Sequence, residues 1–306
     1  AVIAAAPAGS TVALAPGSDC RQILIKSLST GVSVDIDGSR IVGLQMVAGS
    51  GGLTFKRGKF EAPLGRAGFA LTGYAISLTG VTDVAFEGAD ISNANKGIVL
   101  TGSKNVRFTG LYVHGSLGDG LIGTLSDGVT IEWSRFTDWT PAIPTTCKLP
   151  SGEIRYALAQ RDCVAIFGTW ADGDHQDGSQ LFKGVKRVTI RHNFMSGVSQ
   201  GFDALSGLNR PNGAARPAAW NPANEDWLIY DNWVQVIGYH SISVYDCVRC
   251  KIFRNVIGPN LYPGRKSPIR PGNADVGVIS CGNLDPYEAK NRVPCPAGFE
   301  LPISAR

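Results

Sequence analysis

A strand-and-turn unit recurs along this chain at a period of 22 or 23 residues. Each copy has a short run of alternating apolar residues, a corner of one or two residues and a second short run. A repeat of this length indicates a chain that stacks similar units in one direction, as solenoids do. The copies are Val84 to Ile91, Val106 to Val113, Val129 to Phe136, Val188 to Met195, Leu228 to Val234 and Lys251 to Ile257.

The composition agrees with many short strands joined by tight corners. The 306 residues include 38 glycines, only 2 methionines and almost no stretch with helical periodicity. Gly, Asn and Asp favour corners, and β-branched residues favour strands. A solenoid grows in length without splitting into domains, so we predict one all-β domain over residues 1–306. The Pro- and Gly-rich tail, 258–306, is expected to be an irregular C-terminal cap.

The repeat also predicts which side chains face inward. Ile98 and Leu100 are two residues apart, and so are Val106 and Phe108; this alternation places them inside the coil. Asn193, Asn232 and Asn255 occupy one corner in three successive units. Because Asn tolerates left-handed backbone and hydrogen-bonds along a stack, we predict an asparagine ladder there.

The opening of the chain carries a family resemblance. Residues 9–17 read G-x-x-V-x-L-x-P-G, and a second short strand follows at residues 21–25. Together with the repeat, this resembles the first coil of the pectate-lyase-like right-handed parallel β-helix superfamily. The resemblance covers residues 8–258 and implies a single-stranded right-handed parallel β-helix. It further implies an activity toward polysaccharides, since most members cleave or bind them.

The net charge of the chain indicates what kind of molecule it binds. The net charge is +4 and the isoelectric point about 8.7. Nucleic acid would call for a denser stripe of Lys and Arg, so an acidic polysaccharide is the expected partner. No apolar run reaches the roughly 18 residues that a membrane span needs, so we expect no membrane partner. Mixed polar outward positions favour a monomer.

The cysteines indicate the compartment. Among seven cysteines, Cys147 with Cys163 and Cys281 with Cys295 each close a Pro- or Gly-rich loop. Cys247 and Cys250 have C-x-x-C spacing, but no second pair or nearby His completes a zinc site. Loop-closing disulfides indicate an oxidising compartment. With no N-x-S/T sequon present, we expect a secreted or periplasmic protein of bacterial or phage origin.

Two insertions interrupt the repeat, at 138–173 and 206–226. Long segments of this kind are commonly functional, and these two flank one short stretch of coil. They would therefore form the walls of a groove. Within them, Trp170, Trp220 and Arg210 are predicted to bind substrate. Three other aromatic side chains near the insertions are further candidates for stacking on sugar faces: Trp139, Trp227 and Trp233.

The densest polar cluster of the chain lies at residues 172–180. It contains H-x-D-G-x-Q, which resembles a motif of carbohydrate-active β-helix proteins. Aligning Phe182 with the inward Leu100 gives His175, Asp177 and Ser179 outward positions. We predict that His175 acts as a base, oriented by Asp177, with Gln180 binding substrate.

Neighbouring coils are expected to add to the same patch, because successive coils lie about 4.8 Å apart. Arg191 and Lys183 would pair with a uronate carboxylate. The next coil would contribute Gln200 and Asp203, and the one after it Tyr239 and His240. Of these residues, Arg191, Tyr239 and His240 join His175 and Asp177 as the predicted catalytic set.

These residue types favour a polysaccharide lyase. β-Elimination needs neutralisation of the uronate, a base for the C5 proton and an acid for the leaving oxygen. Ca²⁺ is a further expectation, because Asp172 and Asp174, with Asp177 and Asp203, are oxygen ligands of the kind it prefers. Two alternatives stay open. One is a glycoside hydrolase using Asp177 with Asp174 or Asp203, although the usual N-x-D and D-D signatures are missing. The other is a non-catalytic, tailspike-like glycan-binding module.

Overall fold

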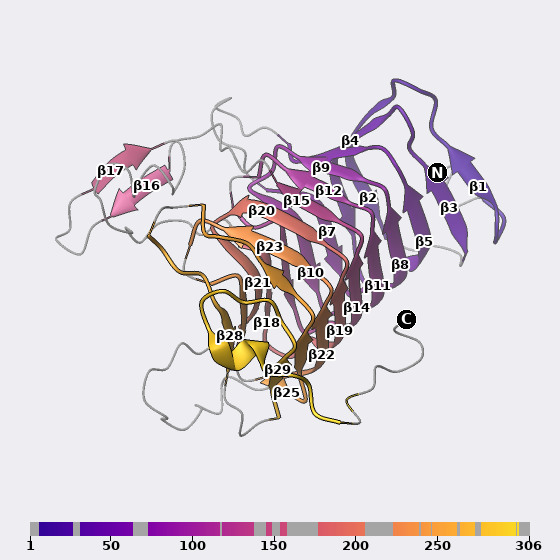
Figure 1. The fold of residues 1–306 in the computed structure, drawn as a ribbon. Coiled ribbons are helices and arrows are strands. Elements are labelled where there is room, and N and C mark those ends of the chain that lie inside the picture. The colour runs from indigo at the N-terminus through magenta and orange to yellow at the C-terminus, as the bar shows by residue number, and fades with distance from the viewer. Residues whose placement is uncertain are drawn as a thin grey trace.

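The protein was analysed as a computed structural model. It describes residues 6–26, 31–63, 73–116, 118–137, 145–148, 154–157, 177–205, 223–238, 240–245, 247–261, 264–272, 277–297 and 299. The described strands wind into a right-handed parallel β-helix, with successive coils stacked along one axis (Figure 1). The predicted fold class is therefore confirmed.

Each complete coil contributes a strand to one long parallel sheet, which has 11 strands within the described residues. These strands are β1 (Thr11–Ala13), β3 (Val32–Asp35), β5 (Gly51–Lys56), β8 (Thr82–Glu87), β11 (Lys104–Thr109), β14 (Asp127–Glu132), β19 (Lys186–Arg191), β22 (Asn224–Tyr230), β25 (Cys247–Val248), β26 (Lys251–Phe253) and β29 (Ile279–Cys281). Each predicted repeat begins in this sheet.

The second sheet has 16 strands in the described part of the chain. A bend divides it into two halves, each a row of parallel strands, and the halves are joined through β4 (Arg40–Met46). The first half contains β6 (Lys59–Glu61), β9 (Asp90–Ser92), β12 (Tyr112–His114), β15 (Arg135–Thr137), β20 (Phe194–Val198), β23 (Trp233–Val236) and β27 (Val256–Ile257). The second half contains β7 (Tyr74–Thr79), β10 (Lys96–Thr101), β13 (Leu121–Thr124), β18 (Asp177–Phe182), β21 (Gln200–Leu205), β24 (Ile242–Tyr245) and β28 (Ile269–Pro271).

One long strand spans the bend and joins the two halves. β4 (Arg40–Met46) pairs with β6 through residues 40–42 and with β7 through residues 44–46. β2 (Asp19–Ile25) lies beside β4 at the N-terminal end of the sheet. Outside the helix, β16 (Thr145–Lys148) and β17 (Ile154–Ala157) form an antiparallel pair.

The interior is filled by equivalent side chains from successive coils. Val84, Val106, Val129 and Val188 follow one another in register and are buried. Each buried side chain of this size stabilises the fold by roughly 1.5–3 kcal/mol. The next position in this row is Trp227, which is buried and donates its indole N–H to the carbonyl of Val185 at 2.9 Å. A sugar-stacking role for Trp227 is therefore wrong.

The asparagine ladder is confirmed and is longer than predicted. The backbone N–H of Asn193 donates to Oδ1 of Asn232 at 3.0 Å, and that of Asn232 donates to Oδ1 of Asn255 at 3.1 Å. Asn283 continues the ladder, because its Oδ1 accepts the backbone N–H of Asn255. At the other end, the backbone N–H of Ser134 donates to Oδ1 of Asn193. Since all these groups are buried, each side chain satisfies backbone polar atoms that water cannot reach.

The C-terminal tail is more regular than predicted. β28 pairs with β24, and β29 pairs with β26, so the tail extends both sheets by one strand each. A short 3₁₀ helix, Ala289–Arg292, follows. The strands were missed because each has only three residues and is surrounded by Pro and Gly, which hide an alternating pattern.

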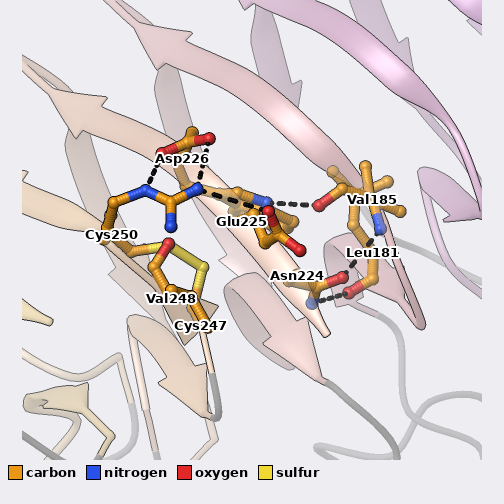
Figure 2. The surroundings of a disulfide bond; sticks show 10 residues. Leu181, Val185, Asn224, Glu225, Asp226, Cys247, Val248 and Cys250 are labelled. Carbon is orange, nitrogen blue, oxygen red and sulfur yellow. Dashed lines mark hydrogen bonds and ion pairs between the residues drawn. A yellow bond between two sulfur atoms is a disulfide. The ribbon is translucent and has the colours of Figure 1, made fainter. Parts of the chain in front are cut away.

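Two disulfides lie within the described residues. Cys281–Cys295 is as predicted, while Cys247–Cys250 joins the two ends of a corner that we did not expect to be bridged. Figure 2 shows this second bridge beside Asn224 and Glu225, whose strand β22 pairs with β25. Two disulfides fit an oxidising compartment. The predicted Cys147–Cys163 bond lies outside the described side chains, and Cys20 is a free cysteine.

Among the residues that the structure describes, no helix has the length and apolar character that crossing a bilayer requires.

Candidate functional site

Three aspartates meet at the bend in the second sheet, and we call them the carboxylate cluster: Asp119, Asp177 and Asp203. Asp119 lies two residues before β13, Asp177 begins β18, and Asp203 lies in the middle of β21. β13, β18 and β21 are successive neighbours in the sheet, and their register places Asp119 and Asp177 in one row. Asp203 lies on the next strand, three residues beyond the Gln200 that pairs with Asp177, and its charge acts on Asp177.

The N-terminal side of the cluster is held by Asp119. Its Oδ1 accepts the backbone N–H of Asp177 at 3.3 Å, and its Oδ2 lies 3.7 Å from Nζ of Lys96. Lys96 is the first residue of β10, one coil before Asp119. A partly exposed ammonium group therefore forms one edge of an otherwise acidic cluster.

The opposite edge is formed by β24 and the residue before it. Ser243 donates its hydroxyl hydrogen to Oδ1 of Asp203 at 2.6 Å, and Nδ1 of His240 lies 3.3 Å from the same oxygen. Ser243 also contacts His240 Nδ1. Because Asp203 and Ser243 both face Nδ1, they fix the orientation of the imidazole ring.

Some oxygens of the cluster have no polar partner among the described residues. Both carboxylate oxygens of Asp177, and Oδ2 of Asp203, are buried and make no hydrogen bond within the described part of the chain. A buried carboxylate without partners costs free energy, which it reduces by taking up a proton. Buried, unsatisfied acids of this kind are candidates for catalytic groups.

The electrostatics of the cluster favour protonated carboxyl groups. Burial raises the pKa of Asp177 well above its usual value, and the charges of Asp203 and Asp119 raise it further. The pKa of Asp119 is raised to about 6, chiefly by burial, against the lowering effect of Lys96. The cluster therefore holds a proton near neutral pH, as a general acid must.

This cluster makes stability depend on pH. Between the ordinary pKa of 3.8 and the folded value of about 6, folded Asp119 binds more protons than the unfolded chain does. The free energy of unfolding should therefore fall as pH rises through that window. We expect Asp119→Asn, which keeps an acceptor for the Asp177 N–H, to stabilise the protein at pH 7 by about 1–3 kcal/mol. The gain should vanish near pH 4. Urea unfolding at both pH values measures it, and equal stability at pH 7 would contradict the assigned shift.

The structure brings five of the predicted site residues together. Asp177 and Gln200 pair in register, as do Gln180 and Asp203, so each carboxylate has a glutamine on the adjacent strand. His240 completes the group through its contact with Asp203.

Three features of the predicted site are corrected. Leu181, not Phe182, aligns with Gly123 and Leu100, so Ser179 falls in the buried row of Leu121. The sequence alignment of the coils failed because Leu181 and Phe182 are adjacent and either one fits the apolar position of the repeat. An error of one residue exchanges the inward and outward faces of the strand.

Arg191 lies in the other sheet, on β19, where it is paired with Glu132 at 2.7 Å and bonds Tyr230. The chain turns a corner between β18 and β19, so the next strand in sequence does not share the face of β18. Lys183 is exposed just past the far end of β18, six residues and about 20 Å of strand away from Asp177.

Other predicted site residues lie outside the described residues. These are His175, Tyr239, Arg210, Trp170, Trp220, Asp172 and Asp174. Where the structure does describe side chains, no group of three or more His, Cys, Asp or Glu is arranged to hold a metal ion. The calcium site, which relied on Asp172 and Asp174, stays a prediction.

Sequence reasoning missed Asp119, Lys96 and Ser243. Lys96 and Asp119 are one repeat apart, and each lies at the start of a strand of the second half, Lys96 as the first residue of β10 and Asp119 two residues before β13. The period of the sequence alone gives this signal. Asp119 and Asp177, however, are separated by 58 residues, because an insertion stands between adjacent coils. Counting by the repeat therefore loses the register at this step.

Comparison with known proteins supports the fold of this chain and nothing finer. No protein-family model and no curated protein matches the chain. Among solved structures, a GH136 lacto-N-biosidase from Eubacterium ramulus is 11% identical, with a TM-score of 0.45 over 87% of this chain and 51% of that one. The Dettilon tailspike protein is 12% identical, with a TM-score of 0.42 over 89% and 53%.

A pectate lyase is also 12% identical, with a TM-score of 0.38 over 94% of this chain and 71% of that one. This chain spans about half the length of the first two structures. The similarities concern architecture, and the reaction of this chain has to be inferred from its own residues.

Proposed function

We propose that this protein is a glycan-cleaving enzyme that hydrolyses glycosidic bonds with the carboxylate cluster. The observation that carries the proposal is the buried group Asp119, Asp177 and Asp203, in which the pKa of two members is raised. Carboxyl groups in different environments are the arrangement that glycoside hydrolysis requires, one giving a proton while another acts as a carboxylate.

Asp177 is the proposed general acid. Its raised pKa keeps the carboxyl proton available, and neither of its oxygens is engaged by another described side chain. It donates this proton to the glycosidic oxygen while the bond from that oxygen to the anomeric carbon breaks.

Asp203 is the proposed carboxylate partner. The Ser243 hydroxyl and His240 hold Oδ1, leaving Oδ2 without a described partner. Asp203 takes a proton from the attacking water, whose oxygen bonds to the anomeric carbon. One water is consumed, and one new reducing end and one new hydroxyl are formed. Gln180 and Gln200, on neighbouring strands, supply amide groups that bind sugar hydroxyls.

A lyase, which the sequence favoured, finds less support in these contacts. β-Elimination needs a strong base and a group that neutralises a uronate. Arg191 is paired with Glu132 in the other sheet, and Lys96 is beside Asp119. Among the described residues, the basic groups that border the cluster are His240 and Lys96, and these are the ones that a lyase could use there.

The experiment is incubation of the protein with soluble polysaccharides, both polyuronates and neutral glycans, while two products are followed. We expect reducing ends to accumulate without the ultraviolet absorbance of unsaturated uronates. Unsaturated products would instead establish the lyase. A substrate that binds without any turnover would favour the non-catalytic module, and the Asp177→Asn variant serves as the control for contaminating activity.

A further inference from the structure

A recess lies on the same sheet as the carboxylate cluster, nearer the N-terminus. It is a groove of about 470 Å³ over β2, β4 and β7. Its lining includes Gln22, Leu24, Gln45, Tyr74 and Ser77. A volume of this size is within the usual range for small-ligand sites.

The bend in β4 shapes this groove. Gly43 separates the residues of β4 that pair with β6 from those that pair with β7, and it has a φ of +77°. A Cβ at this position would lie 3.1 Å from Cγ of Pro63. Both the left-handed backbone and the close approach of Pro63 therefore favour glycine at this position, where Gly43 and Pro63 line the groove.

The lining has the chemistry of a site for uncharged sugar. It offers the side-chain amides of Gln22 and Gln45 and the hydroxyl of Ser77, and among the described lining residues only Tyr74, through its phenol, is ionisable. Tyr74 and Leu24 are 46% and 48% exposed, which is high for large apolar side chains. An open aromatic ring beside amide and hydroxyl groups binds the apolar face of a pyranose and its hydroxyls together.

The groove is aligned with the carboxylate cluster. Gln45, Ser77, Val99, Ile122, Gln180 and Asp203 follow one another in register on successive strands. Ser77 is four strand spacings from Asp203, about 19 Å at about 4.8 Å each. In the parallel row, Tyr74 pairs with Lys96, which contacts Asp119. Figure 1 shows β7, β10, β18 and β21 arranged along the axis of the helix.

From this alignment we infer that the groove over β2, β4 and β7 is a distal binding site for neutral sugar residues of a glycan chain lying along the helix axis. The inference extends the proposed function, because the other part of the same chain would cross the carboxylate cluster. It makes the substrate a polymer with neutral residues, rather than a short or wholly uronic oligosaccharide.

The test is affinity electrophoresis of Tyr74→Ala in gels that contain a soluble neutral polysaccharide, namely a β-glucan, a galactan or a galactomannan, with a polygalacturonate gel run in parallel. We expect at least one of them to retard the wild-type protein, and the variant to bind it about tenfold more weakly, which corresponds to about 1.4 kcal/mol. Gln45→Ala should weaken binding as well, whereas Tyr74→Phe, which keeps the ring, should bind nearly as the wild type does. Trp133→Ala is the matched control, because Trp133 is an exposed aromatic residue at a corner away from this groove.

Equal retardation of wild type and Tyr74→Ala would overturn the inference, and so would retardation by polygalacturonate alone or by no polysaccharide. The result is independent of catalysis, since Asp177→Asn should be retarded as strongly as the wild type. If binding depended on Tyr74 but the protein cleaved no glycan, the distal binding site would be supported and the proposed hydrolase would be wrong. If the protein cleaved the glycan but Tyr74→Ala bound it as strongly as the wild type, the proposed hydrolase would be kept and the distal binding site would be wrong.

Discussion

Asp177→Asn should lower kcat on the glycan substrate by at least about a hundredfold, because the general acid supplies that much or more in comparable reactions. The amide has nearly the shape of the carboxyl group but no proton to give. The same substitution should raise the free energy of unfolding at neutral pH, since it removes the carboxyl whose pKa burial raises most clearly. Kinetics and urea unfolding on the same preparation measure both effects.

The opposite directions of these two effects separate catalysis from folding. A variant that lost activity by misfolding would be less stable, not more. Asp231→Asn is the control, because Asp231 lies outside the cluster and its carboxylate pairs with Arg254 at 2.6 Å. That variant should keep full activity. An active Asp177→Asn enzyme would remove Asp177 from the mechanism.

Asn232→Ala should lower the free energy of unfolding by about 3–5 kcal/mol. Asn232 accepts hydrogen bonds from both the backbone and the side chain of Asn193, and it donates to the carbonyl of Ile190 at 3.0 Å. Alanine would leave these buried groups without partners, and water cannot replace the amide there. Urea unfolding of the variant and the wild type gives the difference.

Gln235→Ala provides the comparison within the same coil. Its side-chain amide donates one solvent-accessible hydrogen bond, at 2.8 Å, to the carbonyl of Pro259. Its loss should cost less than about 1 kcal/mol, because water satisfies the carbonyl instead. If the two variants lost equal stability, the ladder would not be a principal source of stability between coils.

Much of the fold follows from the period of the sequence. Val84, Val106 and Val129 are one repeat apart, and the structure stacks them in register. The corner asparagines were predictable for the same reason, since their spacing places Asn232 over Asn255. The Cys247–Cys250 bridge was not, because proximity in space and the oxidising state of a C-x-x-C pair are not encoded in its spacing.

The site was only partly predictable. Asp177, Asp203 and His240 stand out as polar residues where strands begin or face outward, and the structure brings them together. Asp119 was lost because an insertion breaks the count between its coil and the next. Arg191 was misplaced because one-dimensional spacing does not show that the chain turns between β18 and β19.

The central claim is that the carboxylate cluster adds water across a glycosidic bond. Mass spectrometry of the products formed in oxygen-18-labelled water tests this most directly. Hydrolysis predicts one labelled oxygen at each new reducing end and none elsewhere. Products that carry no label and have the mass of an unsaturated sugar would contradict it.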